Sequence, residues 1–297
     1  MLTVLASLVF AAQEDKTLTG HAKEITSLAF RPDGRVLASL SADNTIRYWD
    51  LNTGKEIRKV ASEATATQIA FDSKGARLAV EEAGLRILDG ETGEEKSKLE
   101  IGFGGIMGLA FMPDGALLVA ATAADGVQFV DASTGETVRA IENAGSIAAL
   151  RSDGKAVAYT TNSTMAHVAD AVSLKEIRSF SGHAGTIEYV ALSADGQRLF
   201  TADDQGSLRG WDVSNGKQLF EFKKERAFGM ALRSDGKILA LELSGEVVLV
   251  DASTGKEIRK IEADASVSCG TLDFSPDGKV LAIGLSNGGI RLIHLGK

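Results

Sequence analysis

The sequence predicts an all-β fold built from seven copies of one small unit, and three observations carry this prediction. A turn motif that ends in glycine recurs at nearly even spacing, and each stretch between its copies divides into four strand-like segments. No segment shows a sustained helical apolar period. A fixed period near 40 residues indicates a repeat architecture in which each unit packs against its neighbours.

The turn motif sets the period. Its glycines, from Gly34 to Gly278, follow one another at steps of 41, 40, 39, 42, 40 and 42 residues. The copies are RPDG (31–34), DSKG (72–75), MPDG (112–115), RSDG (151–154), SADG (193–196), RSDG (233–236) and SPDG (275–278). Glycine suits these turns because it adopts a positive φ without steric cost. One ring of seven units therefore uses nearly the whole chain of 297 residues.

Each unit contains four short segments separated by turn residues. In the first unit, 20–60, these segments are ITSLAF, RVLASLS, TIRYWDL and KEIRKV. They are six or seven residues long, rich in β-branched and apolar residues, and bounded by Gly, Asp, Asn or Pro. Such a layout is typical of consecutive antiparallel hairpins, so each unit is predicted to be a four-stranded sheet.

The third strand of six units ends in aspartate, immediately before a turn such as NTG. These aspartates are Asp50, Asp89, Asp131, Asp170, Asp212 and Asp251. A carboxylate in this place accepts hydrogen bonds from the backbone of its own turn. We therefore interpret the aspartates as turn residues and not as an acidic site.

A four-stranded sheet repeated radially is the blade of a β-propeller, so the sequence predicts a seven-bladed β-propeller over residues 15–297. The predicted blades are 20–60, 61–100, 101–142, 143–180, 181–222, 223–262, and 263–297 together with 15–19. The last unit contains only three strands. Leu18 precedes His21 by the same three residues as Phe180 precedes His183, so 15–19 is predicted to supply the missing fourth strand.

At this point the first unit resembles the WD-repeat family of β-propellers. It opens with Gly-His at 20–21 and closes with Trp-Asp at 49–50. In that family a His, a Ser or Thr, an Asp and the Trp form a hydrogen-bonded network inside the blade. The matching residues here are His21, Ser39 or Ser41, Asp43 and Trp49. A satisfied polar network of this kind stiffens a thin sheet.

The fifth unit carries the same signature with one change. His183, Thr201 and Trp211 match the family pattern, but Gln205 stands where the network aspartate belongs. The other five units lack the His, the Trp or both. The resemblance implies a stable interaction scaffold, because assembly with other proteins is the usual role of the family.

The amino-acid composition argues against several classes of partner. The formal net charge is −8, and no basic face is evident, so a nucleic-acid partner is not expected. No apolar run reaches the roughly 18–20 residues that a membrane-spanning helix needs. The four histidines and the single cysteine show no metal-ligand spacing, so neither a metal nor another cofactor is expected.

The first twelve residues differ in composition from the rest of the chain. Residues 2–12 (LTVLASLVFAA) are apolar with small residues at their end, and polar QEDK follows. This pattern resembles the apolar region and cleavage site of a secretory signal. We therefore expect export, to a secreted or periplasmic location. The alternative is an apolar N-terminal tail packed on the domain of a cytoplasmic protein.

A binding site is expected where the innermost strands begin, at one mouth of the central channel. Counting back from the turn glycines aligns one residue per blade at this mouth and a second residue two positions earlier. From these columns we select Met107, Glu188, Arg226, Phe228, Glu24, Thr26 and Thr67 as candidate binding residues. Methionine, aromatic and arginine side chains are the types enriched in binding hot spots.

We consider two candidate functions that belong to different classes. The first is a non-catalytic, monomeric scaffold that holds a protein or peptide on the channel face. The alternative is an enzyme of the lactonase or cofactor-dependent dehydrogenase type, which other propellers represent. GLSNG (284–288) matches the G-x-S-x-G pattern of serine hydrolases, but it lies between two predicted strands and reads as a hairpin. Since Glu188 alone is ionisable in the mouth column, we expect the scaffold.

Overall fold

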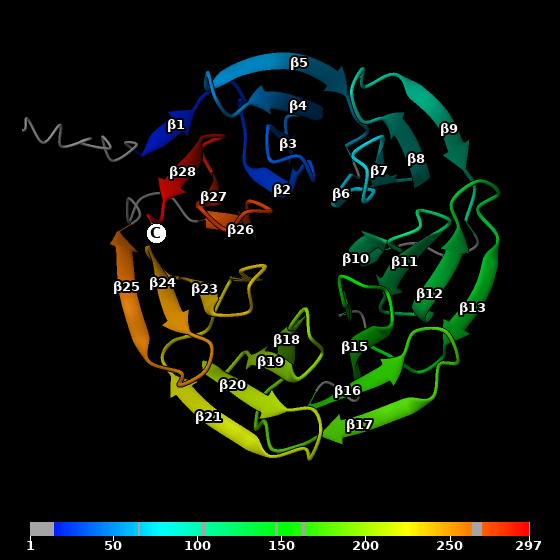
Figure 1. Cartoon of the computed structure of the whole chain (residues 1–297). Helices are drawn as coiled ribbons and strands as arrows, with labels where there is room; N and C mark the ends of the chain where they lie inside the picture. Colours follow the sequence, from blue (N-terminus) through cyan, green and yellow to red (C-terminus); the bar gives the residue numbers. More distant parts are fainter. Residues whose placement is uncertain are drawn as a thin grey trace, which may run out of the picture.

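A computed structural model describes residues 15–64, 66–101, 105–145, 148–161, 164–262 and 269–296. The apolar segment 1–12 lies outside the described residues. Over the described part, the chain is all-β, as predicted: it forms seven sheets of four antiparallel strands arranged in a ring (Figure 1). No helix of this part is long and apolar enough to cross a membrane.

Each blade uses strands that follow one another along the chain. Blade 1 contains β2 (Ile25–Phe30), β3 (Val36–Ser41), β4 (Thr45–Asp50) and β5 (Lys55–Ala61); blade 2 contains β6 (Ile69–Phe71), β7 (Arg77–Glu82), β8 (Gly84–Asp89) and β9 (Glu95–Leu99); blade 3 contains β10 (Ile106–Phe111), β11 (Leu117–Thr122), β12 (Gly126–Asp131) and β13 (Thr137–Ile141). Blade 4 contains β14 (Ala148–Leu150), β15 (Ala156–Thr161), β16 (Met165–Asp170) and β17 (Glu176–Phe180); blade 5 contains β18 (Ile187–Leu192), β19 (Arg198–Asp203), β20 (Ser207–Asp212) and β21 (Gln218–Lys223). Blade 6 contains β22 (Gly229–Leu232), β23 (Ile238–Leu243), β24 (Glu246–Asp251) and β25 (Glu257–Glu262); blade 7 contains β26 (Cys269–Phe274), β27 (Val280–Leu285), β28 (Ile290–His294) and β1 (Lys16–Leu18). The first strand of blades 1 to 7 lies next to the channel, and the fourth lies at the rim (Figure 1).

The ring closes through the predicted N-terminal strand. β1 pairs antiparallel with β28, with Lys16 opposite Leu292 and Leu18 opposite Ile290. Leu18 is only 2% exposed and packs in a cluster that also contains Trp49 of blade 1. The Nζ of Lys16 donates to the backbone oxygen of Asn52. β1 therefore completes blade 7 and also contacts blade 1.

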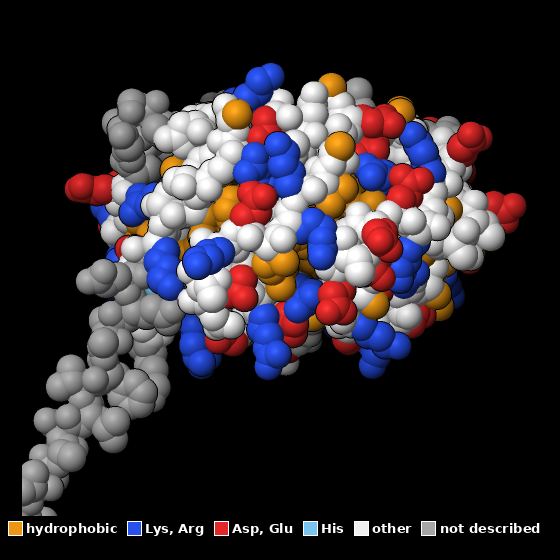
Figure 2. Space-filling model, turned by 90° about the horizontal axis from the view of Figure 1, so that it is seen from above, with side chains coloured by type: hydrophobic (Ala, Val, Ile, Leu, Met, Phe, Trp, Pro, Cys, Tyr) orange, Lys and Arg blue, Asp and Glu red, His pale blue; other side chains and the backbone are white. Residues whose placement is uncertain are grey.

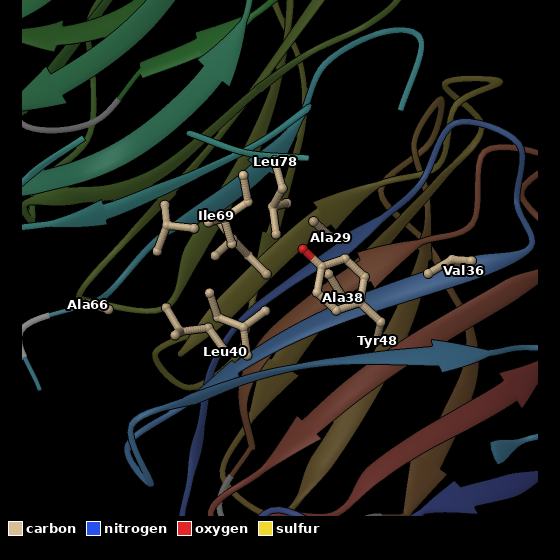
Figure 3. Packing of buried hydrophobic residues seen from close by; sticks show 11 residues of the cluster. Ala29, Val36, Ala38, Leu40, Tyr48, Ala66, Ile69 and Leu78 are labelled. Atoms are coloured by element: carbon tan, nitrogen blue, oxygen red, sulfur yellow. The ribbon is translucent and has the colours of Figure 1, made fainter. Parts of the chain in front are cut away.

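The core lies between neighbouring blades. The second strand of each blade is almost wholly buried, because both of its faces meet apolar side chains. Figure 3 shows the cluster between blades 1 and 2, where Leu40 and Tyr48 face Ile69 and Leu78. Seven clusters of this kind, one at each junction, link the blades into one ring.

A β-bulge on the outer strand of six blades was not anticipated. The extra residue is a half-exposed aliphatic side chain in five blades and a lysine in blade 2: Ile57, Lys96, Val138, Ile177, Leu219 and Ile258. In three blades the following arginine donates to a backbone carbonyl in the next blade: Arg58 to Glu91, Arg139 to Ala171 (3.1 Å) and Arg178 to Val213 (2.9 Å). The bulge bends the strand, so the side chain after it reaches the neighbouring blade.

The part of the rim seen in Figure 2 carries cationic and anionic side chains close together, with apolar side chains scattered between them. Several opposite charges are paired, for example Lys98 with Glu63 at 2.8 Å. Exposed pairs of this kind contribute little to stability. The apolar clusters between the blades therefore carry most of the stabilisation.

Leu18→Ala should destabilise the ring by about 3 kcal/mol, because it removes a fully buried side chain from the junction that closes the ring. Chemical denaturation measures the change, and Thr17→Ala, on the exposed face of the same strand, serves as the matched control. Equal stabilities of the two variants would show that β1 does not close the ring.

Tyr48→Phe should leave the ring as stable as before or stabilise it by about 1 kcal/mol. Tyr48 is 1% exposed, and its hydroxyl lies among apolar side chains without a hydrogen-bond partner in the described part of the chain (Figure 3). Burial also raises the pKa of this phenol above its ordinary value. Thermal denaturation tests the change; a clear loss of stability would show that the hydroxyl has a partner.

Candidate functional site

Blade 1 contains a buried polar network in which one histidine is connected to residues of β3, of the β3–β4 turn and of β4. The Nε2 of His21 lies 2.8 Å from Ser39 Oγ, and Trp49 Nε1–H donates to the same Oγ at 2.8 Å. The Nδ1 of His21 lies 3.0 Å from an oxygen of Asp43. Ser41 bonds neither to the histidine nor to the tryptophan, because its hydroxyl donates to the backbone oxygen of Lys23 and accepts the backbone amide of Asp43. Ser39 is therefore the serine of the network.

Blade 5 contains the same network with its aspartate in another place. The Nε2 of His183 lies 2.6 Å from Thr201 Oγ1, which also accepts the indole N–H of Trp211 at 2.8 Å. The carboxylate on His183 Nδ1 comes from Asp203, at 2.7 Å. Gln205, which the sequence alignment places at the aspartate position, does not contact His183. The strand β19 itself supplies the carboxylate, two residues earlier than in blade 1.

The histidines of both networks are buried. Burial lowers the pKa of His21 and of His183 below the ordinary value, although the neighbouring carboxylates act in the opposite direction. Burial alone raises the pKa of Asp43, but hydrogen bonds from Thr45, from the Ala22 amide and from His21 together lower it to about 2. The histidines are thus neutral at pH 7, and hydrogen bonds at both ring nitrogens hold each of them in place.

The six aspartates at the ends of third strands make the expected turn bonds. The Oδ1 of Asp251 accepts the backbone amides of Ser253 (2.9 Å) and Thr254 (2.8 Å), and Asp50 accepts the amide of Thr53 in the same way. Side-chain hydrogen bonds from Ser253 and Thr254 lower the pKa of Asp251 to about 2. These carboxylates are occupied by their own turns.

The channel opens into a cavity of about 660 Å³ where the innermost strands begin, and we call this opening the strand-start mouth. Five of the candidate binding residues line this cavity: Thr26, Met107, Glu188, Arg226 and Phe228. Met107 is 61% exposed and Phe228 is 46% exposed, although both side chains are apolar. The structure therefore brings most of the candidate residues to one place.

A group of contacts joins blades 5 and 6 at this mouth. Arg226 forms a two-pronged ion pair with Glu188, with Nε–Oε2 and Nη2–Oε1 distances of 2.8 and 2.5 Å. Its guanidinium also lies 5.7 Å from the centre of the Phe228 ring. The hydroxyl of Tyr189 donates to the backbone oxygen of Phe228 at 2.5 Å. Tyr189 was not a candidate in the sequence, because it lies one residue beyond the aligned column.

Thr67 and Glu24 lie elsewhere. Thr67 lines a neighbouring cavity between blades 2 and 3, where its hydroxyl and its amide both donate to Glu81, at 2.6 and 3.1 Å. Burial raises the pKa of Glu81, and the bonds from Thr67 act against this effect. Glu24 is exposed, and its backbone oxygen accepts the amide of Ala42 at 2.9 Å. Neither side chain joins the group at the strand-start mouth.

The hydrolase-like motif forms the hairpin expected of it. Gly284 lies in β27, the Gly288 amide donates to the Leu285 carbonyl at 3.1 Å, and β28 follows directly. A nucleophilic serine of this class needs a strand-to-helix turn, which this segment does not form. Among the residues that the structure describes, no three His, Cys, Asp or Glu side chains gather in a way that could hold a metal ion.

One carboxyl in the channel wall was missed. Asp273 lies on β26, and its Oδ2 accepts the backbone amide of Phe30 in blade 1 at 3.2 Å. Its side chain is surrounded by the ring yet retains some contact with the channel. Burial raises the pKa of Asp273 to about 7, and the backbone amides of Phe30 and Phe274 only partly oppose this effect.

Asp273 should make the ring less stable as the pH rises from about 4 to about 7. In this range the unfolded carboxyl, with an ordinary pKa near 3.9, has lost its proton, whereas the folded carboxyl still holds it. Asp273→Ala should therefore raise the melting temperature at pH 8 and change it little at pH 4, with a gain on the order of 2 kcal/mol at pH 8. Denaturation of both proteins across this pH range is the measurement; parallel profiles would assign the pH dependence to other groups.

The model of the family described as "WD domain, G-beta repeat" matches residues 12–50 and 174–212, the segments that end in the Trp-Asp pairs of blades 1 and 5. These are also the two blades that contain the buried histidine network.

Several relatives resemble the chain over much of its length. "Pre-mRNA-processing factor 19 homolog 2" of Arabidopsis thaliana is 22% identical over 289 residues, which cover 94% of this chain and 48% of that protein. "THO complex subunit 3" of Arabidopsis thaliana is 20% identical over 296 residues, covering 93% of this chain and 91% of that protein. "Guanine nucleotide-binding protein subunit beta" of Oryza sativa subsp. indica is 29% identical over 128 residues, 41% of this chain and 32% of that protein.

The chain spans about half the length of the first of these relatives and about a third of the guanine nucleotide-binding subunit. The family match coincides with the two blades that hold the histidine networks. The chain therefore matches the WD-repeat family in these two segments, and it has the seven-bladed β-propeller fold.

Proposed function

We infer that the chain is a non-catalytic scaffold that holds a protein or peptide at the strand-start mouth. The observation that carries this proposal is the exposure of Met107 and Phe228 at one cavity, which the Glu188–Arg226 pair also lines and where Phe228 lies against Arg226. Apolar anchors with an arginine nearby are the usual composition of a binding hot spot. Two of the relatives are named as subunits, of the THO complex and of a guanine nucleotide-binding protein, which supports an assembly role.

The mouth differs from the remaining apolar surface in how its side chains are grouped. The other exposed aliphatic residues lie mainly one per blade, on the outer-strand bulges. Single exposed apolar residues are common on monomeric proteins, whereas grouped ones beside a hollow mark interaction sites. Met107 and Phe228 line the same hollow from blades 3 and 6.

The arrangement at the mouth favours binding over catalysis. Glu188 and Arg226 neutralise each other, and the Tyr189 hydroxyl is committed to a backbone carbonyl. A general acid or base needs a group that is free to exchange a proton with a substrate. No observation at this mouth favours the lactonase or dehydrogenase alternative.

The proposal predicts that Met107→Ser combined with Phe228→Ser weakens partner binding by about tenfold or more, since truncated hot-spot residues each cost more than about 1 kcal/mol. Both side chains are exposed, so the melting temperature should stay the same. A partner captured from the native host with the wild-type ring, then purified, provides the ligand for calorimetric titration.

The matched control is Ile57→Ser combined with Ile258→Ser, which removes two aliphatic side chains of similar exposure, 49% and 52%, from the rim. Binding should be unchanged in this control. If the control loses binding while the mouth variant keeps it, the partner binds the rim and the proposed site is wrong.

A further inference from the structure

Asp273 differs from the residue at the same position in the other six blades. The residue five positions before the turn glycine is alanine in each of them: Ala29, Ala70, Ala110, Ala149, Ala191 and Ala231. This position lies near the channel, where the innermost strands of neighbouring blades approach one another, so a small side chain fits best. Blade 7 alone carries a carboxyl here, at Asp273.

The carboxyl faces a second cavity of about 470 Å³, at the end of the channel bounded by the turn motifs. We call this end the turn face. The cavity meets the strand-start cavity at Ser27, Gln68, Thr271 and Leu272, which line both, so the two hollows form one channel. Asp273 therefore lies where a group that enters from the turn face can reach it.

The charged neighbours of Asp273 are already paired. Asp72 and Arg151 line the same cavity, but Asp72 is bound to Arg77 at 3.0 Å and Arg151 to Asp153 at 2.6 Å. Within the described ranges, no lysine, arginine or histidine forms an ion pair with Asp273. A largely buried carboxylate without a cation is costly, and such a group beside a hollow marks a candidate site.

Closure of the ring does not require this carboxyl. Its bond to the Phe30 amide uses one oxygen, and an uncharged asparagine could make the same bond. Six junctions between blades form with alanine in this place. The charge itself thus has no structural role among the described contacts.

We propose that Asp273 is the recognition site for one cationic side chain, a lysine or an arginine of a peptide that enters the channel from the turn face. The ammonium or guanidinium group would donate a charge-assisted hydrogen bond to the carboxylate and supply the cation that the ring lacks. The site is separate from the strand-start mouth and does not depend on the function proposed there.

The test uses three blocked tripeptides of the form acetyl-Gly-X-Gly-amide, with lysine, arginine or norleucine as X. Calorimetric titration and thermal denaturation are done at low salt and pH 8.5, where the carboxyl is ionised. The lysine and arginine peptides should bind and raise the melting temperature, because a ligand that binds only the folded ring stabilises it. The norleucine peptide, which has similar size and no charge, should do neither.

Asp273→Asn should weaken binding of the lysine peptide by about tenfold or more, through loss of a charge-assisted bond. Asp114→Asn, which removes an exposed carboxylate from a turn on the same face, is the matched control and should bind as the wild type does. The Met107→Ser, Phe228→Ser ring should also bind normally, so this site and the mouth are tested separately.

Equal binding of the lysine and norleucine peptides to the wild type would overturn the proposal without any variant. Unchanged lysine binding by Asp273→Asn would overturn it as well. If that variant does not fold, Asp273→Ala replaces it, since alanine occupies this position in the other six blades.

Discussion

The ring depends on the pairing of β1 with β28. Each blade buries its two faces against its neighbours, so an open row of blades would leave an apolar face bare at either end. Three residues from the beginning of the described chain complete the last sheet and cover one side of blade 1 as well. The seven clusters between blades are therefore all closed, and the ring holds together although no covalent bond joins its ends.

Geometry sets what each radius of the ring can contain. Near the axis the strands converge, and alanine fills the position facing the next blade six times. At the rim the strands diverge, and bulged outer strands allow Arg58, Arg139 and Arg178 to span the gap to the next turn. The binding positions that we propose lie where blades depart from this common plan. Phe228 and Met107 stand out at the mouth, and Asp273 stands out in the wall.

Much of the fold was predictable because turns and strands are local features. The spacing of the turn glycines alone gave the number of blades, and the three-residue offset between Leu18 and His21 gave the closing strand. The network of blade 1 followed from the family resemblance. That of blade 5 was misread at Gln205, because a carboxylate two residues earlier, at Asp203, reaches the same histidine nitrogen.

The site was harder to predict because it depends on contacts between blades. Alignment on the turns placed Glu188 and Phe228 in one column but did not pair Glu188 with Arg226, which lies 38 residues away. The hydrogen bonds of Thr67 to Glu81 depend on the second strand of blade 2, which the columns of innermost-strand residues did not include. Asp273 was visible in the sequence as the exception among six alanines, but that column lies toward the turn face and not at the mouth.

The shortness of β1 has a consequence for the motions of the ring. β1 is held to its sheet by only three paired residues, whereas the outer strands of the other blades have five to seven residues. Detaching β1 should therefore cost less free energy than detaching any of these strands. We therefore expect the native state to fray first at this seam. Amide exchange and protease cleavage should then begin at the edge of β28, before the other blades lose protection.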